Sequence, residues 1–222
     1  MNTDIIKFEI AGMTLQEPMA LITNWMMSAF CLYAFFKLKN VNTPELIWWK
    51  RFFFVFTISS FFGGTGHLFF QYHGIPGKFP NWITGILSGY MAGRAVMTHF
   101  SESKAKQGLH LFLIVKAFGL LSLAIVLQKF IFIAVDAIIT YVVFCGIIAY
   151  NLSKKGLVEL KYLYYGVIIC LPSAFIFILK LSPHRWLNKD DLSHLLMLAC
   201  LYCFYLSAHK RMHLKSVNIS NH

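Results

Sequence analysis

The chain has 222 residues, of which 58% are hydrophobic and 13% are charged, and its net charge is +11. A soluble domain has about a quarter charged residues, so this composition leaves too little polar surface to coat a water-soluble globule. The Lys and Arg residues lie mostly in short segments between apolar runs, where they can meet lipid headgroups, and a nucleic-acid partner is not expected. The five cysteines all lie inside apolar runs, which argues against a disulfide framework.

Apolar runs recur along the whole chain. A helix needs roughly 20 apolar residues to cross the hydrocarbon core of a bilayer. The runs predict an all-α, seven-transmembrane helix bundle with spans near 17–36, 52–72, 82–100, 109–127, 130–150, 162–179 and 192–208. No stretch between them is long enough to bury a separate aqueous core, so residues 1–222 are predicted to form a single integral membrane domain. Only Gln128 and Lys129 separate the fourth and fifth runs, which predicts a tight turn.

The basic residues between the spans are unevenly distributed. The first, third and fifth loops together with the C-terminal tail carry a twofold excess of Lys and Arg over the opposite set of segments. The positive-inside rule places the richer set in the cytoplasm. Because the number of spans is odd, the N-terminus is then predicted to lie outside and the C-terminus in the cytoplasm.

Polar and ionisable side chains inside a membrane are costly, and each is a candidate for function. The predicted topology sorts them by depth into two groups. The outer group comprises Glu17, Asn24, His67, Asp136, Asp190, Asp191 and His194, and the inner group comprises Arg94, His99 and Lys116. Two histidines and several acids thus gather at one level, which is the main functional signal of the sequence.

Asp190 and His194 are four residues apart and therefore project from one face of a helix. Two such side chains can hold one metal ion, and His67 from a facing helix would complete a His-His-Asp set with a position open for water. Zinc suits these ligands and would activate water for attack on a carbonyl. The alternative is a histidine pair bonded to backbone and water, with Asp190 and Asp191 capping the seventh helix.

Three short motifs carry a resemblance to a known family. They are E-P-M-A-L-I-T-N (17–24), S-S-F-F-G-G-T-G-H (59–67) and N-K-D-D-L-S-H (188–194). With seven spans, they resemble the CREST superfamily, which includes alkaline ceramidases, and more narrowly a mostly bacterial branch of it. The resemblance implies a zinc-dependent hydrolase of a lipid amide in a bacterial inner membrane. His67 and His194 match its zinc ligands, and Glu17 and Asn24 match the acid and the asparagine of its first span.

The sequence departs from the family pattern at three places. Gly63 stands where the family has a serine, and Asp190 stands where it has the first histidine of the last pair. The acid expected early in the third span has no counterpart in residues 81–90. Asp136 on the fifth span is the candidate to supply that acid.

Three functions remain open on these residues. The first is a zinc-dependent membrane hydrolase acting on a lipid amide or ester, with His67, Asp190 and His194 holding the metal and the substrate drawn from membrane lipid. The second is a non-catalytic receptor or assembly protein whose polar cluster holds the bundle together. The third, a proton or ion path, needs acids through the full depth, and the inner group is expected to contain none.

Overall fold

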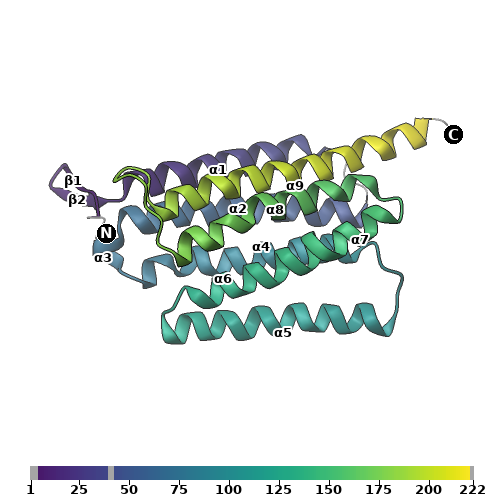
Figure 1. Cartoon of the computed structure of the whole chain (residues 1–222), viewed down its shortest axis with the longest axis horizontal. Helices are drawn as coiled ribbons and strands as arrows, with labels where there is room; N and C mark the ends of the chain where they lie inside the picture. The colour runs from purple at the N-terminus through teal and green to yellow at the C-terminus, as the bar shows by residue number, and fades with distance from the viewer. Residues whose placement is uncertain (1–4, 40–42, 221–222) are drawn as a thin grey trace.

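The computed structural model describes residues 5–39 and 43–220. Figure 1 shows long helices that run side by side along the longest axis of the molecule. In chain order the helices are α1 (Pro18–Lys37), α2 (Pro44–Leu68), the short α3 (Phe70–His73), the 3-10 turn η1 (Pro76–Lys78), α4 (Phe79–Met97), α5 (Lys104–Leu127), α6 (Ile131–Ile138), the π-helix η2 (Ile139–Ile148), α7 (Ala149–Lys154), the 3-10 turn η3 (Val158–Leu160), α8 (Lys161–Ile178) and α9 (Lys189–Ser220).

A small antiparallel hairpin of β1 (Lys7–Ile10) and β2 (Met13–Gln16) precedes α1. Its two-residue turn has Ala11 at φ 50° and Gly12 at φ 76°, the left-handed pair that suits the twist of a tight hairpin. The hairpin lies at one end of the bundle and the last turns of α9 lie at the other (Figure 1). We call these the hairpin end and the C-terminal end.

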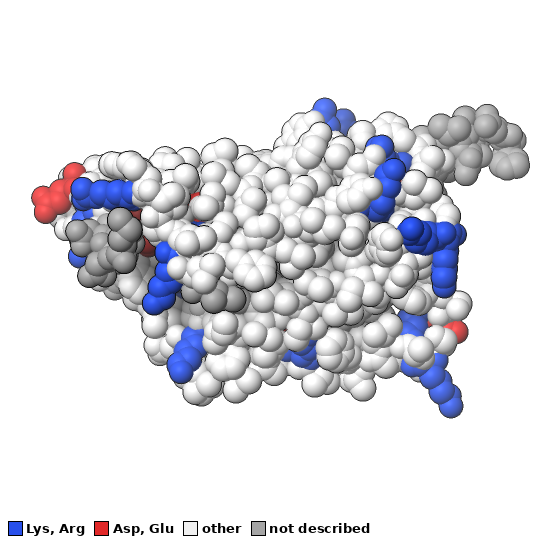
Figure 2. Space-filling model, viewed as in Figure 1, with Lys and Arg blue, Asp and Glu red and all other residues white. Residues whose placement is uncertain are grey.

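Within the described residues, five helices are long and apolar enough to cross a membrane: Pro18–Lys37, Lys104–Leu127, Ile131–Lys154, Val158–Ile176 and Lys189–Leu214. The charged side chains gather toward the two ends of the face shown in Figure 2, and its broad middle is mostly uncharged. The prediction of an all-α chain is confirmed apart from the hairpin, and the prediction of several helices long and apolar enough to cross a membrane is confirmed.

Helices α2 and α4 are also long, with 25 and 19 residues, but they are less apolar than the other five. Their small residues bring neighbouring backbones close. A Cβ atom added to Gly64 of α2 would lie 3.1 Å from the carbonyl oxygen of Leu21 and 3.0 Å from Cδ1 of Trp25. Close packing of this kind is the usual role of small residues between membrane helices.

The start of the second helix was predicted eight residues too late. Helix α2 begins at Pro44, after Thr43, whose side chain accepts a hydrogen bond from the backbone N–H of Leu46. Lys50 and Arg51 therefore lie inside the helix rather than in the loop. Long cationic side chains can extend from a membrane helix toward the interface, so charges do not mark its end.

The predicted tight turn between the fourth and fifth runs is confirmed. Helix α5 ends at Leu127, and Gln128 adopts the left-handed conformation at φ 52°. The backbone N–H of Lys129 then donates to the carbonyl of Ala124 at 3.2 Å, which closes the helix end. Beyond it, α6, η2 and α7 continue as one rod, Ile131–Lys154.

Candidate functional site

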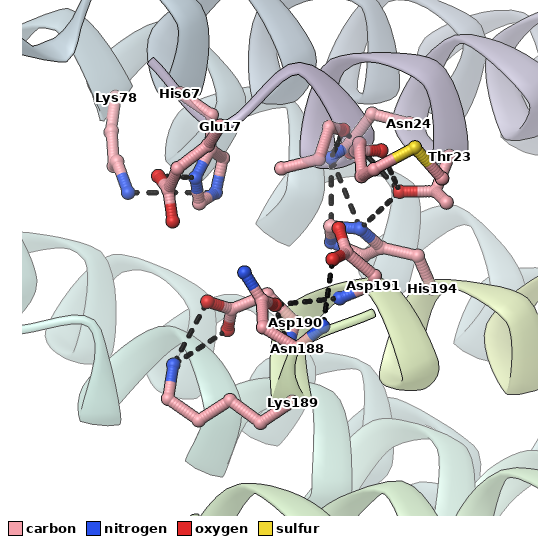
Figure 3. A network of polar contacts seen from close by, with 12 residues as sticks. Glu17, Thr23, Asn24, His67, Lys78, Asn188, Lys189, Asp190, Asp191 and His194 are labelled. Atoms are coloured by element: carbon pink, nitrogen blue, oxygen red, sulfur yellow. Dashed lines mark hydrogen bonds and ion pairs between the residues drawn. The ribbon is translucent and has the colours of Figure 1, made fainter. Parts of the chain in front are cut away.

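Five of the predicted site residues meet at the hairpin end of the bundle. Glu17 directly precedes α1, Asn24 lies on α1, His67 lies in the last turn of α2, and Asp190 and His194 lie in the first turns of α9 (Figure 3). We call these five residues the polar cluster. Segments far apart in the chain thus bring together side chains that sequence position alone could place only at a common depth.

In one half of the polar cluster, Glu17 and His67 are bonded to each other, and Lys78, outside the cluster, contacts His67. His67 Nδ1 donates to Glu17 Oε2 at 2.7 Å, and Lys78 Nζ lies 3.5 Å from His67 Nε2 (Figure 3). The Glu17 and His67 side chains are each 15% exposed. The paired carboxylate fixes the ring orientation and leaves Nε2 as the nitrogen that faces other groups.

The backbone at Glu17 is held in an uncommon conformation, with φ 52° and ψ 55°. Its N–H donates to the carbonyl of Ile6 at 3.0 Å, so the segment before the hairpin holds it in place. A non-glycine residue in the left-handed region is strained, and such strain is frequent at functional sites. Here it occurs at the residue whose carboxylate contacts His67.

The charges around Glu17 and Lys78 perturb both groups. Burial raises the pKa of the Glu17 carboxyl, but the His67 ring bonded to it and the Lys78 ammonium together hold that pKa below its ordinary value. Burial lowers the pKa of the Lys78 ammonium, and the carboxylates of Glu17 and Asp190 offset only part of that effect. The polar cluster is therefore an electrostatically coupled unit.

The other half of the polar cluster surrounds His194. Its Nδ1 lies 2.9 Å from Thr23 Oγ1 and 3.3 Å from Asn24 Nδ2. Asn24 is 5% exposed and donates to the carbonyl of Ala20 at 2.8 Å. The rings of His67 and His194 face each other nearly at right angles, with centroids 6.3 Å apart. Both rings thus have Nδ1 held by a partner.

The start of α9 is capped by Asn188. Its Oδ1 accepts from the N–H groups of Asp190 at 2.8 Å and Asp191 at 3.1 Å. Asp191 Oδ2 accepts in return from the N–H of Asn188 at 2.9 Å, which makes a reciprocal capping box. Of the two aspartates that cap this helix in the alternative interpretation, Asp191 takes part in the cap and Asp190 does not. Its carboxylate instead pairs with Lys189 Nζ at 2.8 Å, beside the polar cluster (Figure 3).

The structure does not bring Asp136 to the polar cluster. This residue is 1% exposed and pairs with the Lys116 ammonium of α5. Lys116 Nζ also donates to Thr140 Oγ1 at 2.8 Å. The pair joins α5 to the α6–η2 rod, and it places Lys116 at the depth of Asp136 rather than in a separate inner group.

The position of Gly63 explains how the polar cluster accommodates a glycine where a serine was expected. A Cβ atom there would lie 2.7 Å from Asn24 Oδ1 and 3.1 Å from Asn81 Nδ2. Ser59 Oγ donates to Asn81 Oδ1 at 2.8 Å, so Asn81 links the neighbourhood of Asn24 to α2. Residues 81–90 thus supply an amide, Asn81, to this neighbourhood in place of the acid that the resemblance implies.

A pocket of about 180 Å³ opens beside the polar cluster, between the start of α1 and the segment that leads into α9. Its polar lining includes Glu17, Ser182, Arg185, Asn188, Asp190 and Asp191. The pocket gives a ligand access to the carboxylates of Glu17 and Asp190. It carries cations as well as acids on its walls.

Contrary to expectation, two acids lie at the depth of the inner group, Glu45 and Glu159. At the C-terminal end, Arg211 of α9 bonds to Glu45 Oε2 at 2.9 Å and to Glu159 Oε1 at 2.7 Å. His99 Nε2 lies 3.1 Å from Glu45 Oε1. Both carboxylates are on residues only 4% exposed. In the sequence both acids stand close to Lys and Arg residues that were assigned to loops, so they were expected to be exposed.

The donor set of the polar cluster suits zinc. A zinc-binding histidine usually donates its other N–H to a carboxylate, as His67 does to Glu17. Two imidazoles on one zinc have centroids roughly 5–6 Å apart, since each nitrogen lies about 2 Å from the ion. The 6.3 Å separation of the two rings is slightly larger. As the side chains stand, no group of three or more His, Cys, Asp or Glu residues in the described chain converges on one point, and Asp190 would have to turn from Lys189.

Comparison with known proteins gives a family but no activity. No curated protein and no solved structure matches the chain. A family of unknown function, DUF6962, matches residues 19–213, which include α1 through most of α9. The chain belongs to this family.

Proposed function

We propose that the chain crosses the membrane seven times, with its N-terminus outside, in the inner membrane of a bacterium. Helices α2 and α4, with 25 and 19 residues, would be about 37 and 28 Å long, enough to span a hydrocarbon core of about 30 Å with little mismatch. Their serines and most of their glycines are buried against other helices, which supports counting them as spans. The excess of basic residues at the C-terminal end supports a cytoplasmic position for that end.

We further propose that the polar cluster is the active site of a zinc-dependent hydrolase acting on a lipid amide or ester. The observation that carries this is the pairing of the two histidines: Glu17 holds Nδ1 of His67, Thr23 lies beside Nδ1 of His194, and the two rings are 6.3 Å apart. With both Nδ1 atoms engaged, the Nε2 atoms are the nitrogens left for a metal. Lys78 Nζ lies 3.5 Å from Nε2 of His67 and Asn24 Nδ2 lies 3.4 Å from Nε2 of His194, so both side chains would move aside when the metal binds.

In this proposal His67, His194 and Asp190 hold the metal, and zinc, when bound, supplies a Lewis acid that polarises the scissile carbonyl. Glu17 keeps the tautomer and orientation of the His67 ring. Asn24 positions the His194 ring, and its amide is a hydrogen-bond donor close to the site. The pocket beside Glu17 and Asp190 admits a lipid headgroup from the membrane surface.

The second candidate is a non-catalytic receptor or assembly protein. It is favoured by the fact that the charges of the polar cluster are paired with protein partners, Glu17 with His67 and Asp190 with Lys189. Paired charges of this kind can hold helices together without any ligand. In that case the pocket would be the surface at which a ligand or partner is recognised.

Turnover distinguishes the two candidates. Purified protein is incubated with a panel of lipid amides and esters, and released fatty acid is measured. The hydrolase proposal expects release by the wild type, loss in His67→Ala and His194→Ala, and no change in His213→Ala, an exposed histidine at the C-terminal end. Equal release by all four proteins, or none by a wild type that binds stoichiometric zinc, would favour the non-catalytic candidate.

A further inference from the structure

A second hollow lies far from the polar cluster, on the half of the bundle near the C-terminal end. It is an open groove of about 570 Å³. One face of α2 forms its floor, with residues spaced three and four apart, and α1 and α4 supply the flanks. The groove is lined by Phe35, Ile47, Lys50, Arg51, Phe54, Val55 and Met91.

The groove is apolar along most of its length and exposed. Ile47 is 36% exposed and Phe54 is 45% exposed, and both project from the same face of α2. Phe35 flanks them from α1 and Met91 from α4. In a membrane, a surface of this shape is covered by an acyl chain, because no water is present to cover it.

The cations of the groove are held in place by aromatic rings. Lys50 Nζ lies 5.0 Å from the centre of the Phe35 ring, and the Arg51 guanidinium lies 4.9 Å from that of Trp48. The Arg94 guanidinium lies 5.0 Å from the same Trp48 ring. Ring contacts orient a cation without neutralising it, so these side chains keep their positive charge.

Neither Lys50 nor Arg51 has a carboxylate partner among the described residues. The acid nearest to them in the sequence, Glu45, is buried and held by Arg211 and His99. In the described part of the chain, the positive charge at this end of the groove therefore has no carboxylate counter-ion. An anionic ligand would supply it.

The depth of the cations matches a lipid headgroup. Lys50 and Arg51 are the seventh and eighth residues of α2, about 10 Å from its first residue along the axis. Phe54 and Val55 lie one turn further toward the middle of the bundle. Side chains on a helix tilt toward its N-terminus, so the long Lys50 and Arg51 side chains can carry their charges up to the membrane interface. The apolar part of the groove leads into the hydrocarbon.

We propose that this groove binds an anionic phospholipid, with its phosphate at Lys50 and Arg51 and an acyl chain along Phe54, Val55 and Met91. Basic pockets between membrane helices are known binding places for such headgroups. The site lies at the opposite half of the molecule from the polar cluster and does not depend on hydrolase activity.

Native mass spectrometry of the protein in detergent tests the proposal. The protein is titrated with phosphatidylglycerol and with phosphatidylcholine of identical acyl chains. Two cations at the membrane surface should together favour the anionic lipid by about 30-fold. The double variant Lys50→Gln/Arg51→Gln should lose most of this preference, while Lys50→Arg/Arg51→Lys should keep it.

The matched control is Lys154→Gln/Lys155→Gln, which removes two cations from the same end of the bundle outside the groove. This variant should bind phosphatidylglycerol like the wild type, and soluble glycerol phosphate should not compete. Equal binding of the two lipids by the wild type would overturn the proposal, and that comparison stands even if a variant does not fold. Equal loss in the control variant would also overturn it, since the effect would then be general surface charge.

Discussion

Replacing Gly63 with Ala tests whether Asn24 occupies the place that the structure assigns to it. The added Cβ would lie 2.7 Å from Asn24 Oδ1, a distance that forces the amide to move. Asn24 is buried and bonded to the carbonyl of Ala20 at 2.8 Å, so moving it disturbs a filled interior. Overpacking of this kind costs about 1–3 kcal/mol.

The matched control is Gly119→Ala on α5, where a Cβ would meet nothing within 4 Å. Both variants gain the same helix propensity, about 1 kcal/mol, so the difference between them isolates the clash. For a chain of this size, the melting temperature of Gly63→Ala should lie roughly 2–12 °C below that of Gly119→Ala. Thermal unfolding of the detergent-solubilised proteins measures it. Equal melting temperatures would mean that Asn24 does not lie against Gly63, and Gly63→Ser would then be free to add a hydroxyl beside His67.

Three further predictions follow from the other buried charges and from the topology. Asp136→Ala should destabilise the protein by about 3–5 kcal/mol because it leaves Lys116 buried without its carboxylate, and the double variant Lys116→Met/Asp136→Leu should recover most of the loss in a melting experiment. Retained hydrolysis in that double variant would refute a catalytic role for Asp136. Arg211→Met should cost a similar amount, since it leaves Glu45 and Glu159 facing each other, and an unchanged melting temperature would contradict the burial of that network. A reporter fused to the C-terminus should be cytoplasmic and one fused before Glu17 extracytoplasmic, and two reporters on the same side would disprove an odd number of spans.

The sequence could predict the helices because lipid requires long apolar runs, and most runs lie within a few residues of the observed helices. It failed at α2, where Lys50 and Arg51 interrupt the apolar run but not the helix. The hairpin at residues 7–16 was also missed. Its strands are four residues each and carry no long apolar pattern, so its only local signal is the Ala11–Gly12 turn.

The meeting of Glu17, Asn24, His67, Asp190 and His194 at one end could be predicted from their depth in the spans, because span number and direction fix which ends meet. The hydrogen-bond and ion-pair partners of these and the other buried polar residues could not be predicted. Nothing local shows that Asp190 turns to Lys189 while Asn188 caps the helix, or that Asp136 is matched to Lys116 twenty residues earlier. Such pairings depend on how the helices rotate and pack, which the sequence of one helix does not contain.

Zinc content tests the central claim most directly. Protein purified without chelators is analysed for metal together with His67→Ala, His194→Ala, Asp190→Asn and the control His213→Ala. The proposal predicts stoichiometric zinc in the wild type and the control, a smaller loss in Asp190→Asn because an amide oxygen still coordinates, and loss of the metal in both polar-cluster histidine variants. A wild type without zinc, or zinc that survives both His67→Ala and His194→Ala, would contradict a metal site in the polar cluster.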